Sequence, residues 1–93
     1  MDEIEIFYLR GCPYCENAKR AVAELLQTEP AYGALTLRWI EENEEKALAD
    51  SHDYYRVPSV FYRGDKLYEC SPLHGYEAIL AHLRAAFDRA LAS

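Results

Sequence analysis

The chain has 93 residues, 51% of them apolar, and a formal net charge of −6 at pH 7. Its length suits one domain over residues 1–93 with a single modest core, and its apolar content, with eight tyrosines, excludes a disordered chain. The acidic balance argues against nucleic acid and anionic membranes as partners, because both are bound through a basic surface.

The first half of the chain has the pattern of a strand, a helix and a second strand. Residues 3–9 are apolar at their centre on both sides, which is typical of a strand covered by helices on both faces. A helical pattern runs from Pro13 to about Thr28, and Pro13 suits a first turn, where its missing N–H costs nothing. Residues 35–41 alternate as a second strand does. The predicted buried face of the helix consists of Ala18, Ala21, Val22, Leu25 and Leu26.

The second half adds a short helix, a hairpin and a last helix. Asn43 can cap a helix over residues 44–52. Residues 60–70 read as a hairpin that turns around Gly64-Asp65. The last helix ends near Ala92, and its start is left open between Pro72 and Gly75. Its predicted buried face consists of Ile79, Leu80, Leu83, Phe87 and Leu91.

The order of these elements is β-α-β-α-β-β-α. A strand-helix-strand unit is expected to be parallel and right-handed, whereas a hairpin is antiparallel. The simplest arrangement is an α/β fold with a four-stranded mixed sheet and helices on both faces. This is the thioredoxin-like architecture.

The sequence has three cysteines and no segment typical of export. It contains neither a charged segment followed by an apolar one at its start nor a run near 18 apolar residues, so we expect a cytoplasmic protein outside the membrane. Structural disulfides are rare in that reducing compartment, and three cysteines cannot all pair within the chain. The spacing of Cys12 and Cys15 therefore indicates redox chemistry or metal binding.

The position of the pair before the predicted helix favours redox chemistry. Cys12 precedes the first turn, where unpaired N–H groups and the helix dipole stabilise a thiolate. Cys15 lies one turn deeper, on the same side and less exposed. We therefore expect Cys12 to attack a substrate disulfide and Cys15 to resolve the mixed disulfide.

A metal site is the competing interpretation. Zinc and iron–sulfur sites normally use four ligands, and the sequence has no second C-x-x-C and no H-x-x-x-H. His52, His74 and His82 look scattered. The remaining metal possibility is a cluster shared between two chains, and we predict no metal ligands within one chain.

The Cys12-Pro13-Tyr14-Cys15 motif after a strand, followed by Val57-Pro58 at the start of a hairpin, resembles the glutaredoxins of the thioredoxin superfamily. The resemblance implies a thioredoxin-like fold, dithiol–disulfide exchange and glutathione as co-substrate, with no tightly bound cofactor. It also implies that Pro58 is cis and lies beside Cys12, that Val57 offers its backbone to the substrate, and that Tyr14 covers the cysteine pair.

The chain departs from the glutaredoxin pattern where that family binds glutathione. Leu9 replaces the usual basic residue before the motif, and Arg10 is a candidate substitute. Arg56 replaces the usual threonine before Val57, and Glu69-Cys70-Ser71 stands where the family has glycines and acidic residues. Either glutathione or a flavin-dependent thioredoxin reductase is then the electron donor. The predicted substrate or glutathione contacts are Arg10, Pro13, Tyr14, Arg56, Val57, Pro58 and Ser71.

The expected function is that of a monomeric oxidoreductase acting on protein disulfides or glutathionylated proteins. The alternatives are an iron–sulfur cluster carrier and a redox-regulated interaction module on the same fold. Cys70 is either an auxiliary thiol near the site or a small buried residue that closes a strand. Tyr54 and Tyr55 would give an apolar rim for a protein substrate.

Overall fold

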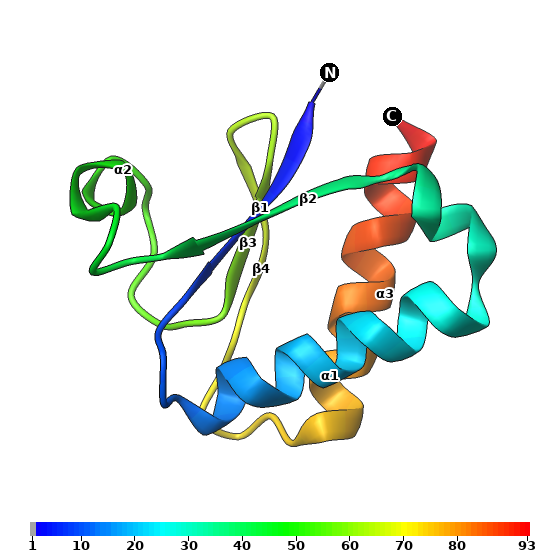
Figure 1. Cartoon of the computed structure of the whole chain (residues 1–93), viewed down its shortest axis with the longest axis horizontal. Coiled ribbons are helices and arrows are strands. Elements are labelled where there is room, and N and C mark those ends of the chain that lie inside the picture. Colours follow the sequence, from blue (N-terminus) through cyan, green and yellow to red (C-terminus); the bar gives the residue numbers. More distant parts are fainter. Residues whose placement is uncertain (1) are drawn as a thin grey trace.

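The computed structural model describes residues 2–93. The predicted order of strands and helices is confirmed, with one additional 3₁₀ helix, η1, after the first α-helix (Figure 1). The elements are β1 (Glu3–Tyr8), α1 (Pro13–Thr28), η1 (Pro30–Ala34), β2 (Thr36–Glu41), α2 (Lys46–Asp50), β3 (Ser59–Tyr62), β4 (Asp65–Glu69) and α3 (Tyr76–Ala92).

The four strands form one mixed sheet in the order β2-β1-β3-β4. β1 pairs with β2 in parallel and with β3 in antiparallel orientation, and β3 and β4 form the antiparallel hairpin. The hairpin turns one residue earlier than predicted, at Arg63-Gly64, where both residues have positive φ (52° and 82°). Two positive φ angles are characteristic of the tight turns whose twist matches that of the strands.

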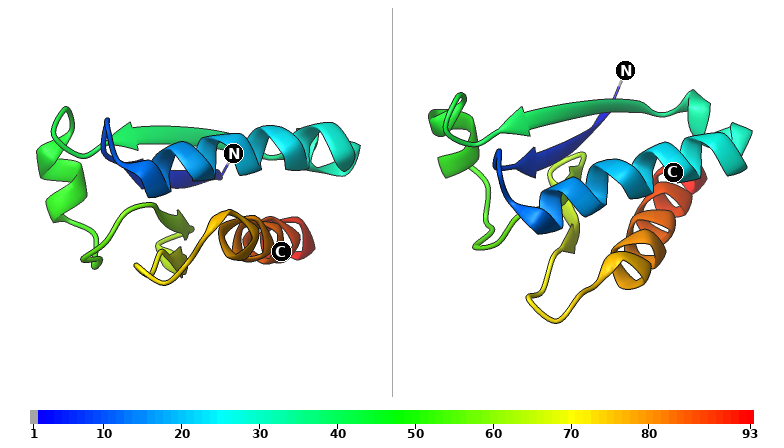
Figure 2. Two further views of the ribbon diagram at one scale, coloured as in Figure 1. Left: turned by 90° about the horizontal axis from the view of Figure 1, so that it is seen from below. Right: turned by 60° about the horizontal axis from the view of Figure 1, so that its bottom comes forward.

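The larger core lies between one face of the sheet and the two long helices. α1 and α3 lie against each other on this face (Figure 2). Ile6 of β1 and Val60 of β3 are fully buried beneath them. The helix residues of this core are Ala18, Ala21, Val22 and Leu25 of α1 and Ile79, Leu83, Ala86, Phe87 and Ala90 of α3.

A smaller core covers the opposite face, as the prediction of helices on both faces requires. Successive side chains of a strand point to opposite faces, so Phe7 points away from Ile6. Phe7 packs there with Phe61 of β3 and Ala49 of α2. α2 lies on the far side of the sheet from α1 and α3 (Figure 1).

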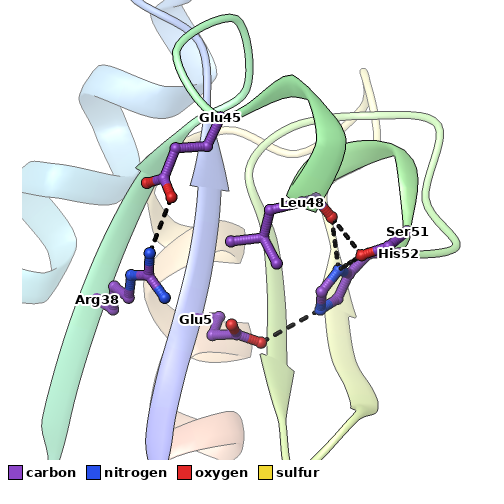
Figure 3. A network of polar contacts seen from close by, with 6 residues as sticks. All are labelled: Glu5, Arg38, Glu45, Leu48, Ser51 and His52. Carbon is purple, nitrogen blue, oxygen red and sulfur yellow. Dashed lines mark hydrogen bonds and ion pairs between the residues drawn. The ribbon is translucent and has the colours of Figure 1, made fainter.

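Polar contacts hold α2 and the turn before it to the central strand β1 and the edge strand β2 (Figure 3). His52, just after α2, lies with Nε2 3.2 Å from the Glu5 carboxylate on β1 and Nδ1 2.9 Å from the Leu48 carbonyl oxygen. Arg38 of β2 donates to the Glu45 carboxylate at 2.9 Å. The helix that closes the smaller core is therefore fixed to both β1 and β2.

α2 is shorter than predicted, and Asn43 does not cap it. The residue before the helix is Glu45, whose side chain makes no capping hydrogen bond. The Asn43 N–H donates to the Glu41 carboxylate at 2.6 Å, and the N–H groups of Glu44 and Glu45 donate to the Glu41 carbonyl. These bonds close a turn over residues 41–45 and delay the helix to Lys46.

Two predicted core positions are wrong. Leu26 is 40% exposed and Leu91 is 38% exposed, because the apolar stripe of each helix extends beyond its covered part. The start of α3, left open by the sequence, lies at Gly75-Tyr76. No helix within residues 2–93 has the length and apolar content needed to cross a membrane.

Candidate active site

Cys12 lies at the start of α1, directly after the turn that leaves β1. Gly11 in this turn has φ +82°, a conformation that costs glycine little. The Cys12 N–H donates to the Leu9 carbonyl, and the Cys12 carbonyl accepts the hydrogen bond from Glu16 N–H that opens the helix. Pro13 is the first helical residue and is exposed. The Cys12 side chain is partly exposed at this end of the helix.

Cys15 lies one turn further along α1 and is fully buried. Burial, and to a smaller extent the neighbouring Cys12 sulfur, raise the pKa of the Cys15 thiol to about 12. Both residues are free thiols. The motif thus holds an accessible sulfur next to a buried one that keeps its proton at neutral pH.

The segment before β3 carries the cis Val57–Pro58 peptide bond, as the resemblance implies. Pro58 is buried, and its carbonyl accepts a hydrogen bond from Cys70 N–H at 3.0 Å. Within residues 2–93 the Val57 N–H and carbonyl have no hydrogen-bond partner. This free backbone pair can receive an extended peptide.

Glu69 of β4 holds this segment in place. Its carboxylate accepts hydrogen bonds from the N–H groups of Tyr55 (3.0 Å) and Arg56 (2.9 Å) and from Lys66 Nζ (2.7 Å). Burial alone would raise the pKa of the Glu69 carboxyl, but these donors outweigh it and lower that pKa. Glu69 is therefore a structural carboxylate of the loop.

A small pocket of about 50 Å³ lies between this segment and the start of α1. Four of the predicted contact residues line it, namely Tyr14, Arg56, Val57 and Ser71. Cys70 and Pro72 complete the lining. The Tyr14 hydroxyl donates to the Pro72 carbonyl at 2.9 Å and so joins the start of α1 to the segment after β4.

Cys70 is a wall of this pocket rather than an exposed thiol. It is 3% exposed, and burial raises its pKa. A hydrogen bond with Tyr68 opposes this rise in the Cys70 pKa, and the negative charge of a Cys12 thiolate adds to it. The sequence left open whether Cys70 is a thiol near the site or a buried residue at the end of a strand. Cys70 is both buried and next to the pocket.

Arg10 does not line the pocket. Its backbone N–H donates to the Glu41 carboxylate at 3.0 Å, and its guanidinium pairs with Glu44 in the turn after β2. Glu44 would therefore compete with a substrate carboxylate for Arg10. The Arg56 guanidinium, in contrast, has no carboxylate partner within residues 2–93.

The positions of Tyr54 and of the pair His74 and His82 differ from those predicted from the sequence. Tyr54 does not form a rim: it stacks on Phe7 (5.1 Å between ring centroids) and its hydroxyl donates to Glu42. His74 and His82 are not scattered, because their rings stack on each other (4.7 Å). Both also stack on the Tyr68 ring. No local pattern in the sequence indicated this stacking, because His74 lies before α3 begins at Tyr76 and His82 lies on that helix.

The His74 ring helps to fix the segment between β4 and α3. Its Nδ1 accepts a hydrogen bond from the Ser71 N–H (3.3 Å) and lies 2.8 Å from the Tyr68 hydroxyl oxygen. No three His, Cys, Asp or Glu residues in the part of the chain that the structure describes are grouped to hold a metal ion. His74 and His82 pack against the Tyr68 ring.

Comparisons of the chain with protein-family models, with curated proteins and with solved structures find no match. The chemistry open to the site follows from its own geometry. An accessible thiol lies at a helix start, a protonated thiol is buried beside it, and a free backbone pair borders the adjoining pocket. This arrangement suits nucleophilic attack on a disulfide followed by resolution within the same chain.

Proposed function

We propose that this chain is a dithiol–disulfide oxidoreductase of glutaredoxin type with a thioredoxin-like fold. The observation that carries the proposal is the difference between Cys12, partly exposed at the start of α1, and Cys15, buried one turn later with a pKa of about 12. The sheet order and the cis Val57–Pro58 bond beside the pocket agree with it.

The reaction transfers two electrons and two protons to the substrate disulfide. The Cys12 thiolate attacks one sulfur, which forms a mixed disulfide and releases the other sulfur as a thiolate. The Cys15 thiol then loses its proton, which this leaving thiolate can accept. The Cys15 thiolate attacks the Cys12 sulfur, which forms the Cys12–Cys15 disulfide, breaks the mixed disulfide and releases the second substrate sulfur as a thiolate. This thiolate takes its proton from water, which received the Cys12 proton when that thiol ionised.

Substrate and electron donor approach through the same pocket. Val57 offers its N–H and carbonyl to the backbone around the substrate cysteine, and Arg56 is the free cation at the rim. Glutathione, recycled by its reductase, or a flavin-dependent thioredoxin reductase returns the two electrons. We expect a cytoplasmic monomer whose substrates are protein disulfides or glutathionylated proteins.

The test follows a single turnover with reduced protein and excess bis(2-hydroxyethyl) disulfide. Mass spectrometry of wild type should show a product with an intramolecular disulfide, and two equivalents of 2-mercaptoethanol should be released. Cys15→Ser should stop at the mixed disulfide on Cys12, and Cys12→Ser should not react. Full turnover by Cys12→Ser would refute the assignment.

A coupled assay then identifies the electron donor. NADPH consumption with glutathione and glutathione reductase is compared with consumption in the presence of thioredoxin reductase. Turnover with only one of the two systems assigns the donor.

A further inference from the structure

A second hollow, the α2 hollow, lies between the turn after β2, one side of α2 and the segment that follows α2. Its volume is about 270 Å³, close to the lower end of the range of about 300–1,000 Å³ that is usual for small-molecule sites. It shares no lining residue with the small pocket of the candidate active site. The polar and aromatic side chains that line it include Glu42, Asn43, Lys46, Asp50, Tyr54 and Tyr55.

The charges in the α2 hollow do not balance. Lys46 Nζ lies 3.4 Å from the Asp50 carboxylate and so offsets one of two negative charges. The Glu42 carboxylate has no cationic partner in the described part of the chain. Both ring nitrogens of His52 already face acceptors outside the lining, one of them the Glu5 carboxylate (Figure 3). Glu42 therefore gives the α2 hollow one unmatched negative charge.

One hydrogen bond holds the Glu42 carboxylate in place. The Tyr54 hydroxyl donates to Glu42 Oε1 at 2.9 Å, and the Tyr54 ring is itself fixed by stacking on Phe7. Burial, and then the bond to Glu42, raise the pKa of the Tyr54 phenol, so the phenol keeps its proton and donates it to the carboxylate. The phenol engages Oε1 alone, which leaves Oε2 as an acceptor for a ligand.

An aromatic side chain lines the same hollow. Tyr55 is 91% exposed. Its backbone is nevertheless fixed, because the Tyr55 N–H donates to the Glu69 carboxylate at 3.0 Å. The face of a tyrosine ring attracts cations, and an ordered backbone lowers the entropy lost when a ligand covers the ring.

These groups suit an organic cation better than a metal ion. Lys46 already pairs with Asp50, and the described residues contain no group of three metal-ligating side chains. A guanidinium, in contrast, donates five N–H groups in a planar fork that matches a carboxylate, and it stacks on aromatic faces. The side-chain carbonyl of Asn43 adds a further acceptor to the lining.

We propose that the α2 hollow binds an organic cation of the guanidinium class, with Glu42 as its charged partner and Tyr55 as the ring that covers it. The inference goes beyond disulfide exchange, because it needs neither cysteine of the motif. A free guanidinium compound and the arginine side chain of a polypeptide carry the same group, and the two sources differ only in what is attached to it.

The experiment titrates reduced, ¹⁵N-labelled protein and follows its backbone amide signals by NMR. The ligands are methylguanidine, a blocked Gly-Arg-Gly tripeptide, and the same tripeptide with citrulline, which has nearly the shape of arginine without its charge. Both guanidinium ligands should shift the amide signals of Asn43 and Tyr55. They should bind about fivefold or more tightly than the citrulline tripeptide, because hydrogen bonds to a charged group are the stronger ones. Tighter binding of the arginine tripeptide than of methylguanidine would support a polypeptide source, and equal affinities would support a free compound.

The variants locate the site. Glu42→Gln should weaken binding of both guanidinium ligands about fivefold, while its amide oxygen can still accept the Tyr54 hydrogen bond. Tyr55→Leu should weaken binding roughly two- to fivefold, and Tyr55→Phe should not, because the ring remains. Glu29→Gln is the matched control: it removes one negative charge from an exposed position outside the lining.

Four results would overturn the inference. They are equal binding of the arginine and citrulline tripeptides, equal losses of affinity in Glu42→Gln and Glu29→Gln, shifts that leave Asn43 and Tyr55 unchanged, and no shift with either guanidinium ligand. The single turnover with bis(2-hydroxyethyl) disulfide tests the dithiol chemistry by itself, so failure of one proposal is distinguishable from failure of the other.

Discussion

Only two residues separate Cys12 from Cys15, yet the two side chains differ strongly in their access to water. Helix geometry places Cys12 at the open end of α1 and turns Cys15 toward the core, where it is 0% exposed. In the proposed reaction, the environment of each sulfur, rather than its residue type, therefore separates the nucleophile from the resolving thiol.

Alkylation should reveal this difference. With reduced protein at pH 7, iodoacetamide should modify Cys12 first and leave Cys15 intact, because a pKa of about 12 leaves roughly one Cys15 thiolate in 10⁵ molecules. Peptide mapping by mass spectrometry measures the extent at each site. Cys12→Ser is the control and should leave the native protein almost unmodified, whereas labelling of Cys15 at the rate of Cys12 would contradict the assignment.

At the scale of elements, the segment before β3 depends on one carboxylate of β4. The pKa of Glu69 is lowered below its ordinary value of 4.5, so the ionised form is bound more strongly in the folded protein. A carboxyl with a lowered folded pKa stabilises the fold above its unfolded pKa, and this stabilisation is lost as the pH falls through the folded value.

Glu69→Gln should therefore lower the free energy of unfolding at pH 7 by about 1–2 kcal/mol, since the side chain makes charged hydrogen bonds while largely buried. It should also weaken the fall in stability below about pH 4.5. Urea unfolding at a series of pH values measures both effects. Glu3→Gln serves as control, because Glu3 is exposed and its side chain has no hydrogen bond in the described part of the chain. A pH profile unchanged by Glu69→Gln would count against this role.

The strands and long helices could be predicted because their signals are local. Pro13 marks the start of α1, and the Ile4 to Tyr8 run indicates a central strand. The limits of α2 could not, since they depend on a turn in which Glu41 accepts N–H groups from Asn43 to Glu45. The exposure of Leu26 was equally hidden, because periodicity gives the direction of a side chain but not where the opposing element ends.

Only those residues of the candidate site that belong to a sequence motif could be predicted. Cys12, Tyr14 and Val57 follow from their motifs, whereas Arg10 was assigned without knowledge of its partner. The parallel pairing of β1 with β2 brings Glu44 next to Arg10. The two residues are 34 positions apart in the sequence, so no local pattern could predict their contact. The Tyr14–Pro72 bond likewise spans 58 residues.

At the scale of the whole molecule, the larger core carries most of the burial. Leu83 of α3 is fully buried in it, while Leu91 on the same helix is 38% exposed. Leu83→Ala should cost about 2–5 kcal/mol, and Leu91→Ala less than about 1 kcal/mol. Denaturant unfolding of the two variants compares one substitution in two environments. If both variants lost the same free energy of unfolding, Leu83 would not be more deeply buried in the larger core than Leu91.

The reduced protein carries several buried or half-buried acids that favour their neutral form in the fold. Burial is the largest cause of the raised pKa in each of Tyr32, Tyr54, Tyr68, Cys15 and Cys70. An acid whose folded pKa lies above its unfolded value releases its proton first in the unfolded chain. Stability is therefore complete below the unfolded pKa and falls as the pH rises beyond it.

For Cys15 this window runs from about pH 9 to about pH 12. Cys15→Ala should lose stability less steeply than reduced wild type over that range, by the equivalent of one proton, or about 1.4 kcal/mol per pH unit. The cavity left by the substitution lowers stability at every pH, so the slope and not its absolute value is the readout. Oxidised wild type should share the shallower slope, because a Cys12–Cys15 disulfide has no proton to release. Identical slopes for reduced wild type and Cys15→Ala would mean that the Cys15 thiol ionises as readily in the fold as in the unfolded chain. The raised pKa of Cys15 could then not explain the proposed roles of the two cysteines.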